Sequence, residues 1–165
     1  MRGTKSLFSD HQFYMEVIMA RALIVFGSTT GNTETTAEQI GNVLSGKAID
    51  VTIQDVAEVN PGDEADYDLV LYGCSTWGED EIELQDDFID YYESMERAAI
   101  SGKGVGVFGC GDSSYTYFCG AVDAIEEKVK AVGGSLVAEG LKIDGEPDEC
   151  EDEITAWAEA VAGAV

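Results

Sequence analysis

From residue 21 onward, short apolar runs alternate with amphipathic helical segments, and this alternation constrains the fold more than any other feature. The run at 22–26 (ALIVF) is unbroken, which is typical of a strand buried on both faces. The other predicted strands are 49–53, 67–73, 104–109 and one continuing from 136–137 into 141–143, and the predicted helices are 33–44, 84–96, 120–132 and 149–162.

Strands that alternate with helices are joined by crossover connections, which place helices on both faces of a parallel sheet. We therefore predict an α/β fold with a doubly wound, five-stranded parallel sheet. The segment 49–53 (IDVTI) alternates apolar and polar residues, which predicts a strand at the edge of the sheet. Ligands of such sheets bind at the carboxyl ends of the strands, so the candidate loops are 27–33, 74–83 and 110–118.

The first loop, 27–33 (GSTTGNT), combines hydroxyl and amide side chains with glycine and contains no lysine or arginine. It opens a predicted helix, whose N-terminus offers free N–H groups and partial positive charge. Without the Gly-Lys-Ser/Thr of a Walker A motif the loop suits a monophosphate rather than a nucleoside triphosphate. The alternative is plain capping of the helix by Thr30 or Asn32. The candidate ligands are Ser28, Thr29, Thr30, Gly31, Asn32 and Thr33.

The second loop places a tryptophan among polar residues, in the order Ser75, Thr76, Trp77 and Gly78. An indole in a polar loop is hard to explain by packing alone, so we predict that Trp77 forms one wall of a pocket for a flat aromatic ligand. Glycine at 78 allows backbone conformations that other residues avoid. The alternative is a tryptophan folded back on the core.

The third loop follows the fourth predicted strand and offers a second aromatic face. We predict Tyr115 as that face and Asp112 as a contact to the ring or sugar of the ligand, whereas Tyr117 and Phe118 are expected to pack inward. The candidate residues of this loop are Cys110, Gly111, Asp112, Tyr115, Tyr117, Phe118 and Cys119.

Histidine and cysteine content excludes several kinds of chemistry. The single histidine, His11, leaves residues 19–165 without one, which excludes Ser-His-Asp and Cys-His catalysis and most zinc sites. The four cysteines form no C-x-x-C, so we expect reduced, largely buried thiols rather than the alternative of an iron–sulfur cluster. The G-x-G-x-x-G at 104–109 lies within a predicted strand, so it indicates close packing rather than a dinucleotide site.

The chain is strongly acidic, with 33 acidic and 9 basic residues and a formal net charge of −24. Nucleic acid and anionic membranes carry the same sign, so neither is expected as a partner. Six of the nine residues at 79–87 are acidic. This run is either an ordinary solvated face or, because it lies beside the predicted ring site, a docking surface for basic proteins.

Residues 1–18 do not resemble the rest of the chain. They show no clear period, and Glu16 interrupts their apolar stretch, so they do not form a signal peptide. Residues 19–21 (MAR) have the character of a natural start. We expect 1–18 to be a poorly ordered or non-native leader and 19–165 to be a single ligand-binding domain without a membrane span.

Four motifs together resemble the flavodoxin family, and closely the short-chain, Desulfovibrio-type flavodoxins of sulfate-reducing bacteria. They are 22–33 (ALIVFGSTTGNT), 73–78 (GCSTWG), 82–88 (IELQDDF) and 108–127 (FGCGDSSYTYFCGAVDAIEE). The resemblance covers about residues 20–165. The insertion that splits the fifth strand of long-chain flavodoxins finds no room between Leu136 and Ile143.

The resemblance implies one non-covalently bound FMN, with its phosphate on the first loop and its isoalloxazine ring between Trp77 and Tyr115. It implies a low-potential one-electron carrier, not an enzyme, that cycles between semiquinone and hydroquinone. The implied partners are redox proteins with basic docking surfaces: reductases, hydrogenase or cytochrome systems, and oxidoreductases that use ferredoxin. A cytoplasmic, monomeric protein is expected.

Two other classes of protein share this topology. An FMN-dependent NAD(P)H quinone or flavin reductase of the same fold is the alternative, but it needs basic residues for the dinucleotide phosphates, and 19–165 contains seven basic residues in all. A phosphorylated receiver domain is rejected, because Gly27-Ser28 and Cys74-Ser75 stand where it needs acidic residues.

Overall fold

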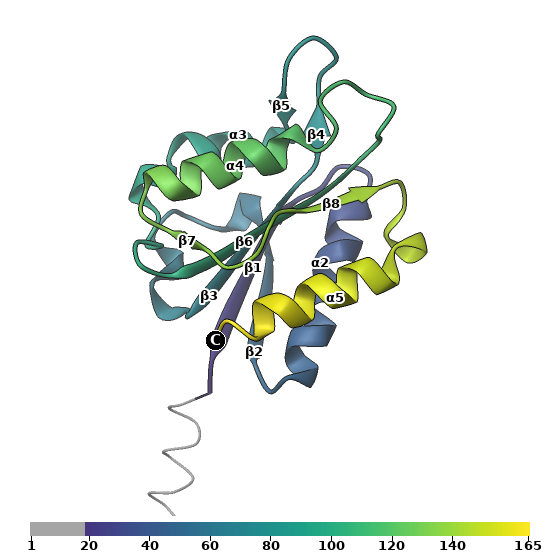
Figure 1. Cartoon of the computed structure of the whole chain (residues 1–165). Coiled ribbons are helices and arrows are strands. Elements are labelled where there is room, and N and C mark those ends of the chain that lie inside the picture. The colour runs from purple at the N-terminus through teal and green to yellow at the C-terminus, as the bar shows by residue number, and fades with distance from the viewer. Residues whose placement is uncertain (1–18) are drawn as a thin grey trace, which may run out of the picture.

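All pairings of the main sheet are parallel in the computed structural model, which describes residues 19–165. The strand order is β2-β1-β3-β6, with both β7 and β8 pairing with β6 (Figure 1). This is the order for which flavodoxin itself is the standard example. The predicted doubly wound parallel sheet is confirmed, but the place of its predicted fifth strand is shared by β7 and β8. The strands are β1 (Arg21–Gly27), β2 (Asp50–Asp55), β3 (Leu69–Cys74), β6 (Gly104–Gly111), β7 (Ser135–Leu136) and β8 (Leu141–Asp144).

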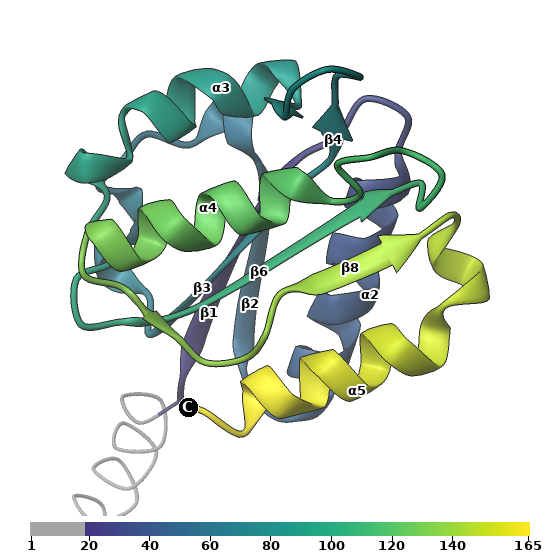
Figure 2. The same ribbon diagram turned by 45° about the horizontal axis from the view of Figure 1, so that its top comes forward.

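Helices cover both faces of the sheet, as predicted. One pair lies on each side, α2 with α5 and α3 with α4 (Figure 2). Their bounds are α2 (Asn32–Gly46), α3 (Asp86–Glu93), α4 (Gly120–Ala131) and α5 (Glu151–Ala162), and the short 3-10 turns are η1 (Val56–Glu58), η2 (Asp63–Asp66), η3 (Met95–Arg97) and η4 (Pro147–Glu149). None of the helices between residues 19 and 165 has the length and apolar character needed to cross a membrane.

The central strand β1 explains why two cores form. Alternate residues point to opposite faces, so Ile24 joins the core under α2 and α5, while Leu23 and Val25 join the core under α3 and α4. All three side chains are completely buried. The edge position predicted for the second strand is also confirmed, because β2 pairs only with β1 within the described chain.

The predicted helix at 84–96 is too long at both ends. An antiparallel hairpin of β4 (Thr76–Trp77) and β5 (Glu83–Leu84) occupies the preceding segment, and α3 begins only at Asp86. The side-chain oxygen of Gln85 accepts hydrogen bonds from the N–H groups of Asp87 and Phe88 and so caps the helix.

The fifth strand is not continuous, in contrast to the prediction. It consists of β7 and β8, separated by residues 137–140. The carbonyl of Glu139 accepts a hydrogen bond from the indole N–H of Trp157 at 2.7 Å, so this group is turned to α5 instead of extending the ladder.

The G-x-G-x-x-G motif lies within β6, which confirms its structural interpretation. A Cβ atom at Gly106 would lie 2.8 Å from Leu71 and 3.0 Å from Trp157, so only glycine allows both neighbours their positions. The predicted leader, residues 1–18, lies outside the described residues.

Candidate functional site

One cavity of about 450 Å³ opens at the carboxyl ends of β1, β3 and β6, where a doubly wound sheet binds its ligands. Residues from all three predicted loops line it. They are Thr30, Asn32, Thr33, Ser75, Thr76, Trp77, Gly78, Glu79, Cys110, Gly111, Asp112, Tyr115, Tyr117, Phe118 and Cys119. Of the predicted site residues, Ser28, Thr29 and Gly31 do not line the cavity, and Glu79 lines it without having been predicted.

The first loop presents an uncapped helix N-terminus to the cavity. The N-cap of α2 is Gly31, in the left-handed region at φ 98°, and no side chain among residues 19–165 caps the helix. The alternative of capping by Thr30 or Asn32 is therefore wrong. The hydroxyl of Ser28 instead accepts the N–H of Gly31 at 3.1 Å and shapes the loop. The N–H groups of the first helical turn are therefore available to an anion.

The buried hydroxyl of Thr33 is a second feature of the first loop that suits a ligand. Its side chain is 1% exposed, and its hydroxyl oxygen has no hydrogen-bond partner among residues 19–165. A buried hydroxyl without a partner is costly, and a ligand oxygen in the cavity would satisfy it.

The second loop holds Trp77 at the cavity instead of folding it into the core. The indole N–H donates to the hydroxyl of Ser75 at 3.1 Å, and the side chain remains 44% exposed. The next residue, Gly78, has φ 89°, and a Cβ atom there would collide with the carbonyl oxygen of Glu81. The hairpin thus needs glycine at this position.

The third loop is fixed to the end of β8. Both the N–H and the hydroxyl of Ser113 donate to the carboxylate of Asp144, at 3.0 and 2.5 Å. Within the loop, the N–H of Ser114 donates to Asp112 at 2.8 Å. Hydrogen bonds from Ser114 lower the pKa of Asp112, so this cavity-lining group stays negative at neutral pH.

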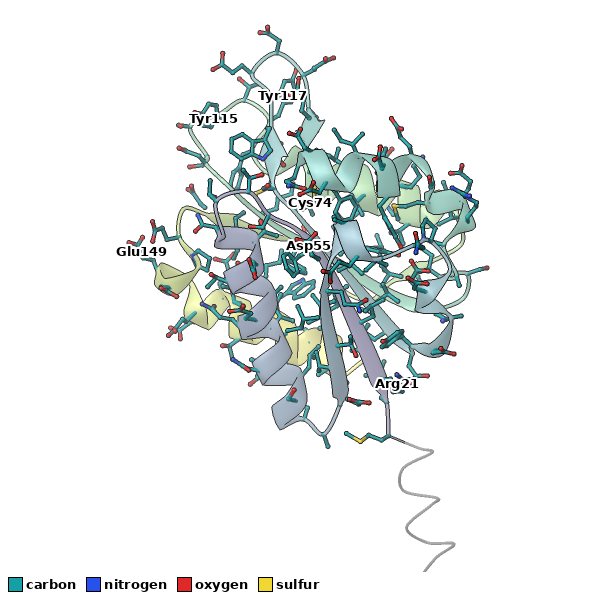
Figure 3. All side chains as sticks on the ribbon, turned by 180° about the vertical axis from the view of Figure 1, so that it is seen from behind. Arg21, Asp55, Cys74, Tyr115, Tyr117 and Glu149 are labelled. Atoms are coloured by element: carbon teal, nitrogen blue, oxygen red, sulfur yellow. The ribbon has the colours of Figure 1, made fainter. Side chains whose placement is uncertain are left out.

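Two aromatic rings stand exposed at this loop. Tyr115 is 56% exposed and Tyr117 is 39% exposed, and Figure 3 shows both at the end of the molecule where the hairpin lies. The inward packing expected of Tyr117 is therefore wrong, because the loop turns its ring to the cavity mouth. Phe118 is half-buried and packs against the core below, as expected.

The cysteines near the cavity are neutral thiols. Cys74, Cys110 and Cys119 are buried and unpaired. Burial raises the pKa of Cys74 and of Cys119 to about 12. Residues 19–165 contain no group of three or more histidine, cysteine or acidic side chains placed to hold a metal, so the iron–sulfur alternative has no support.

The electrostatic character of the cavity is neutral to negative. Among residues 19–165, no lysine or arginine lines it, and the charged residues that do are Glu79 and Asp112. The exposed hairpin tip adds Asp80 and Glu81. A bound anion is therefore held by N–H and hydroxyl groups rather than by cations.

These features fit FMN. The uncapped helix and the unpartnered Thr33 hydroxyl suit its phosphate, and the exposed rings of Trp77 and Tyr115 suit its flat heteroaromatic ring.

Gln85 and Asp144 support the loops, although nothing in the sequence singled them out as site residues. Each acts through a contact distant in sequence: Gln85 lies 56 residues from its partner Thr29, and Asp144 lies 31 residues from Ser113. No local pattern signals such pairs, although glutamine before a predicted helix could have suggested a cap.

Comparison with known proteins gives a consistent result. The Flavodoxin family model matches residues 24–157. A flavodoxin from Maridesulfovibrio salexigens is 57% identical, with 87% of this chain and 98% of that protein covered, and one from Nitratidesulfovibrio vulgaris is 55% identical, with 89% and 100% covered.

Solved structures agree with these matches. Oxidised flavodoxin 1 from Bacillus cereus superposes with a TM-score of 0.80 at 30% identity, covering 88% of this chain and 99% of that one. Oxidised flavodoxin 2 from the same organism gives 0.77 at 34% identity, covering 88% and 100%. The chain therefore belongs to the flavodoxin family, the FMN-binding proteins that carry electrons and are not enzymes.

Proposed function

We propose that the cavity holds the FMN in one orientation, with the phosphate at the N-terminus of α2 and the ring between Trp77 and Tyr115. The uncapped helix supports the first placement, and the exposed aromatic walls support the second. Thr30, Asn32 and Thr33 contact the phosphate in this arrangement, while Ser28, Thr29 and Gly31 shape the loop. Ser75, Thr76, Gly78, Cys110, Gly111, Asp112, Tyr117, Phe118 and Cys119 complete the contacts to the ring and chain of the cofactor.

Bound FMN supplies reversible one-electron chemistry, and the residues around it set how easily the site accepts negative charge. Within the described part of the chain, the phosphate cradle contains no basic side chain, so it leaves the phosphate charge uncompensated. Glu79, in the cavity wall, and the neighbouring acids of the hairpin add charge of the same sign. A flavin ring held between Trp77 and Tyr115 would be covered by them and so shielded from water. The protein is therefore a low-potential carrier, and the neutral-to-negative cavity is the observation that carries this conclusion.

The partners are redox proteins with basic docking surfaces: reductases, hydrogenase or cytochrome systems, and oxidoreductases that use ferredoxin. Around the mouth, the exposed apolar side chains of Trp77, Ile82, Tyr115 and Tyr117 stand beside the acids of the hairpin. Apolar contact supplies affinity and charge supplies orientation, so association weakens as salt rises.

A cytoplasmic location and a monomeric state complete the proposal. The four unpaired cysteines are those of a protein in a reducing compartment, and a net charge of −24 opposes self-association. The reductase alternative is not favoured, because the matched family and the close relatives are flavodoxins.

Anaerobic potentiometry of the holoprotein tests the electrostatic account. The variant combines Glu79→Gln, Asp80→Asn, Glu81→Gln and Glu83→Gln. We expect the potential for the second electron to rise by tens of millivolts, on the order of 59 mV for each tenfold change in stability of the reduced state. NADH or NADPH alone should leave the oxidised absorption spectrum unchanged.

A matched control removes the same number of charges far from the cavity. It combines Glu93→Gln, Glu96→Gln, Glu127→Gln and Glu159→Gln, all exposed and near the C-terminal ends of helices or in η3. Equal shifts of the potential in both variants would mean that only the net charge of the protein matters. An unchanged potential in the hairpin variant would contradict the electrostatic account. Bleaching by NADPH alone would restore the reductase alternative.

A further inference from the structure

Gln85 is a buried polar side chain that lies outside the cavity lining. It is 2% exposed and stands between β5 and α3. An amide in such a place is costly unless its donors and acceptor are all satisfied. The contacts of Gln85 therefore indicate what holds it there.

All four hydrogen-bonding positions of the Gln85 amide are used. Its oxygen accepts from the N–H groups of Asp87 and Phe88, at 3.0 and 3.2 Å. Its nitrogen donates to Asp87 Oδ2 at 3.0 Å and to Thr29 Oγ1 at 3.2 Å. The backbone N–H groups of Asp87 and Phe88 can donate only to the side-chain oxygen of Gln85 and not to its NH2 group. These two partners therefore fix which way the amide is oriented.

The bond to Thr29 crosses from the hairpin to the loop that follows β1. The side chain of Gln85 also fills the space beside the end of β1, because a Cβ atom at Gly27 would lie 2.5 Å from Gln85 Oε1. The backbone N–H of Gln85 donates to the carbonyl of Ser75 at 3.1 Å, which closes the base of the hairpin that carries Trp77. One residue thus connects the first loop, the hairpin and α3.

The hairpin is also connected to the first turn of α4, which follows the third loop in the chain. The hydroxyl of Thr76 accepts the N–H of Ala121, at the start of α4, at 2.9 Å. The side chain of Ile82 covers Gly120, where a Cβ atom would lie 2.8 Å from it. A shift at Thr29 therefore has a hydrogen-bonded route to the Trp77 hairpin and, through Thr76, to the start of α4.

We propose that Gln85 is a positioning residue that couples the conformation of the first loop to the Trp77 hairpin through Thr29. This inference rests on the proposed placement of the phosphate and the ring. It has a specific consequence, because the hydroxyl of Thr29 then supports ring binding even for a flavin without a phosphate. A direct contact from Thr29 to the phosphate has no such effect.

Riboflavin, which lacks the phosphate, and FMN are therefore the two probes. Their affinities are measured by quenching of flavin fluorescence with the full-length apoprotein, for Thr29→Val, Thr29→Ser, Gln85→Met and the Thr29→Val/Gln85→Met double variant. Loss of one neutral hydrogen bond predicts that Thr29→Val weakens riboflavin binding by about threefold to tenfold. Thr29→Ser keeps the hydroxyl and restores binding, and in the Gln85→Met background Thr29→Val has no further effect.

The matched control is Thr155→Val, at an exposed threonine of α5, which should change neither affinity. A loss of affinity for FMN alone would overturn the proposal in favour of direct phosphate contact. Independent, additive losses in the double variant would overturn it as well, because they would mean that Thr29 and Gln85 act separately.

Hydrogen exchange of the flavin-free protein tests the same coupling without a ligand. Thr29→Val is expected to increase amide exchange at 75–85 and to leave α5 unchanged, whether or not Gln85→Met folds. Unchanged exchange at 75–85 would overturn the proposal. If wild-type protein bound neither flavin, the proposed ring and phosphate placement would fail while this measurement still decided the coupling.

Discussion

Trp77 is held at the cavity by a contact within its own loop. Its indole N–H is satisfied by Ser75, and Gly78 provides the turn that follows, so the exposed face of the ring is ready before a ligand binds. Pre-organised aromatic surface binds a flat ligand without further ordering of the chain.

Trp77→Ala is expected to weaken FMN binding by about 1–3 kcal/mol, since it removes an aromatic contact and the apolar area it covers. Fluorescence titration of apoprotein measures this change. Ile89→Ala, at another exposed apolar residue, is the control and should bind FMN as wild type does. Equal affinities in all three proteins would show that Trp77 is not a wall of the site.

Residues differ in how well the sequence predicts their role. Trp77 and the hydroxyls of 28–33 stand out because their type is unusual for their position between predicted elements. Gln85 and Asp144 do not stand out, since their partners are brought to them only by the fold. The inward packing predicted for Tyr117 is wrong because the pattern of apolar and polar residues does not determine how an irregular loop turns.

At the scale of elements, the long strands were predictable and the short ones were not. An unbroken apolar run such as β1 can be satisfied only inside a sheet. The β4–β5 hairpin has two residues in each strand and depends on contacts to Gln85 and α4 rather than on local propensity. The break between β7 and β8 depends on one indole in α5, which no pattern near the break reveals.

Another element-level connection lies at the amino ends of the strands. The buried carboxylate of Glu64, in η2, accepts hydrogen bonds from the hydroxyl of Tyr91 in α3 and from the N–H groups of Gly62 and Ala99. This group holds η2, α3 and the segment before β6 together. Three donors depend on one side chain, so its loss leaves several buried groups unpaired.

Glu64→Ala is expected to lower the free energy of unfolding by about 3 kcal/mol, as each unpaired buried donor costs about 1–3 kcal/mol and relaxation recovers part. Urea unfolding followed by circular dichroism measures it. Glu58→Ala, at an exposed glutamate of η1, should change stability little. The flavin potentials should stay as in wild type; a stable variant with altered potentials would contradict this assignment.

For the molecule as a whole, buried thiols and phenols make the stability of the fold sensitive to alkaline pH. Burial raises the pKa of the Cys74 and Cys119 thiols to about 12 and also raises the pKa values of Cys110, Tyr72 and Tyr91. In the unfolded chain the thiols lose their protons near pH 9 and the tyrosines near pH 10. The folded state keeps these protons longer, so its advantage is complete below about pH 8 and is lost as pH rises.

We expect the free energy of unfolding to be flat from pH 7 to 8 and to fall above pH 9, each thiol such as Cys74 contributing about 1.4 kcal/mol per pH unit until its folded-state pKa is reached. Urea titrations in the presence of reductant measure the slope. Cys74→Ala should reduce the slope of the free energy of unfolding against pH by the contribution of one proton. Cys150→Ala, at a partly exposed thiol, should reduce this slope by less. A slope that is the same in Cys74→Ala and wild type would contradict the role of that thiol.

The two ends of the described chain have a practical consequence. The C-terminus and the start of β1 lie at the same end of the molecule, opposite the β4–β5 hairpin (Figures 1 and 2). Trp77 and Gly78 of that hairpin line the cavity. A protein immobilised through Val165 would turn its cofactor edge away from the support. On an electrode, such an attachment favours exchange of electrons with dissolved proteins. Direct electron transfer to the electrode surface instead requires attachment through a residue beside the hairpin.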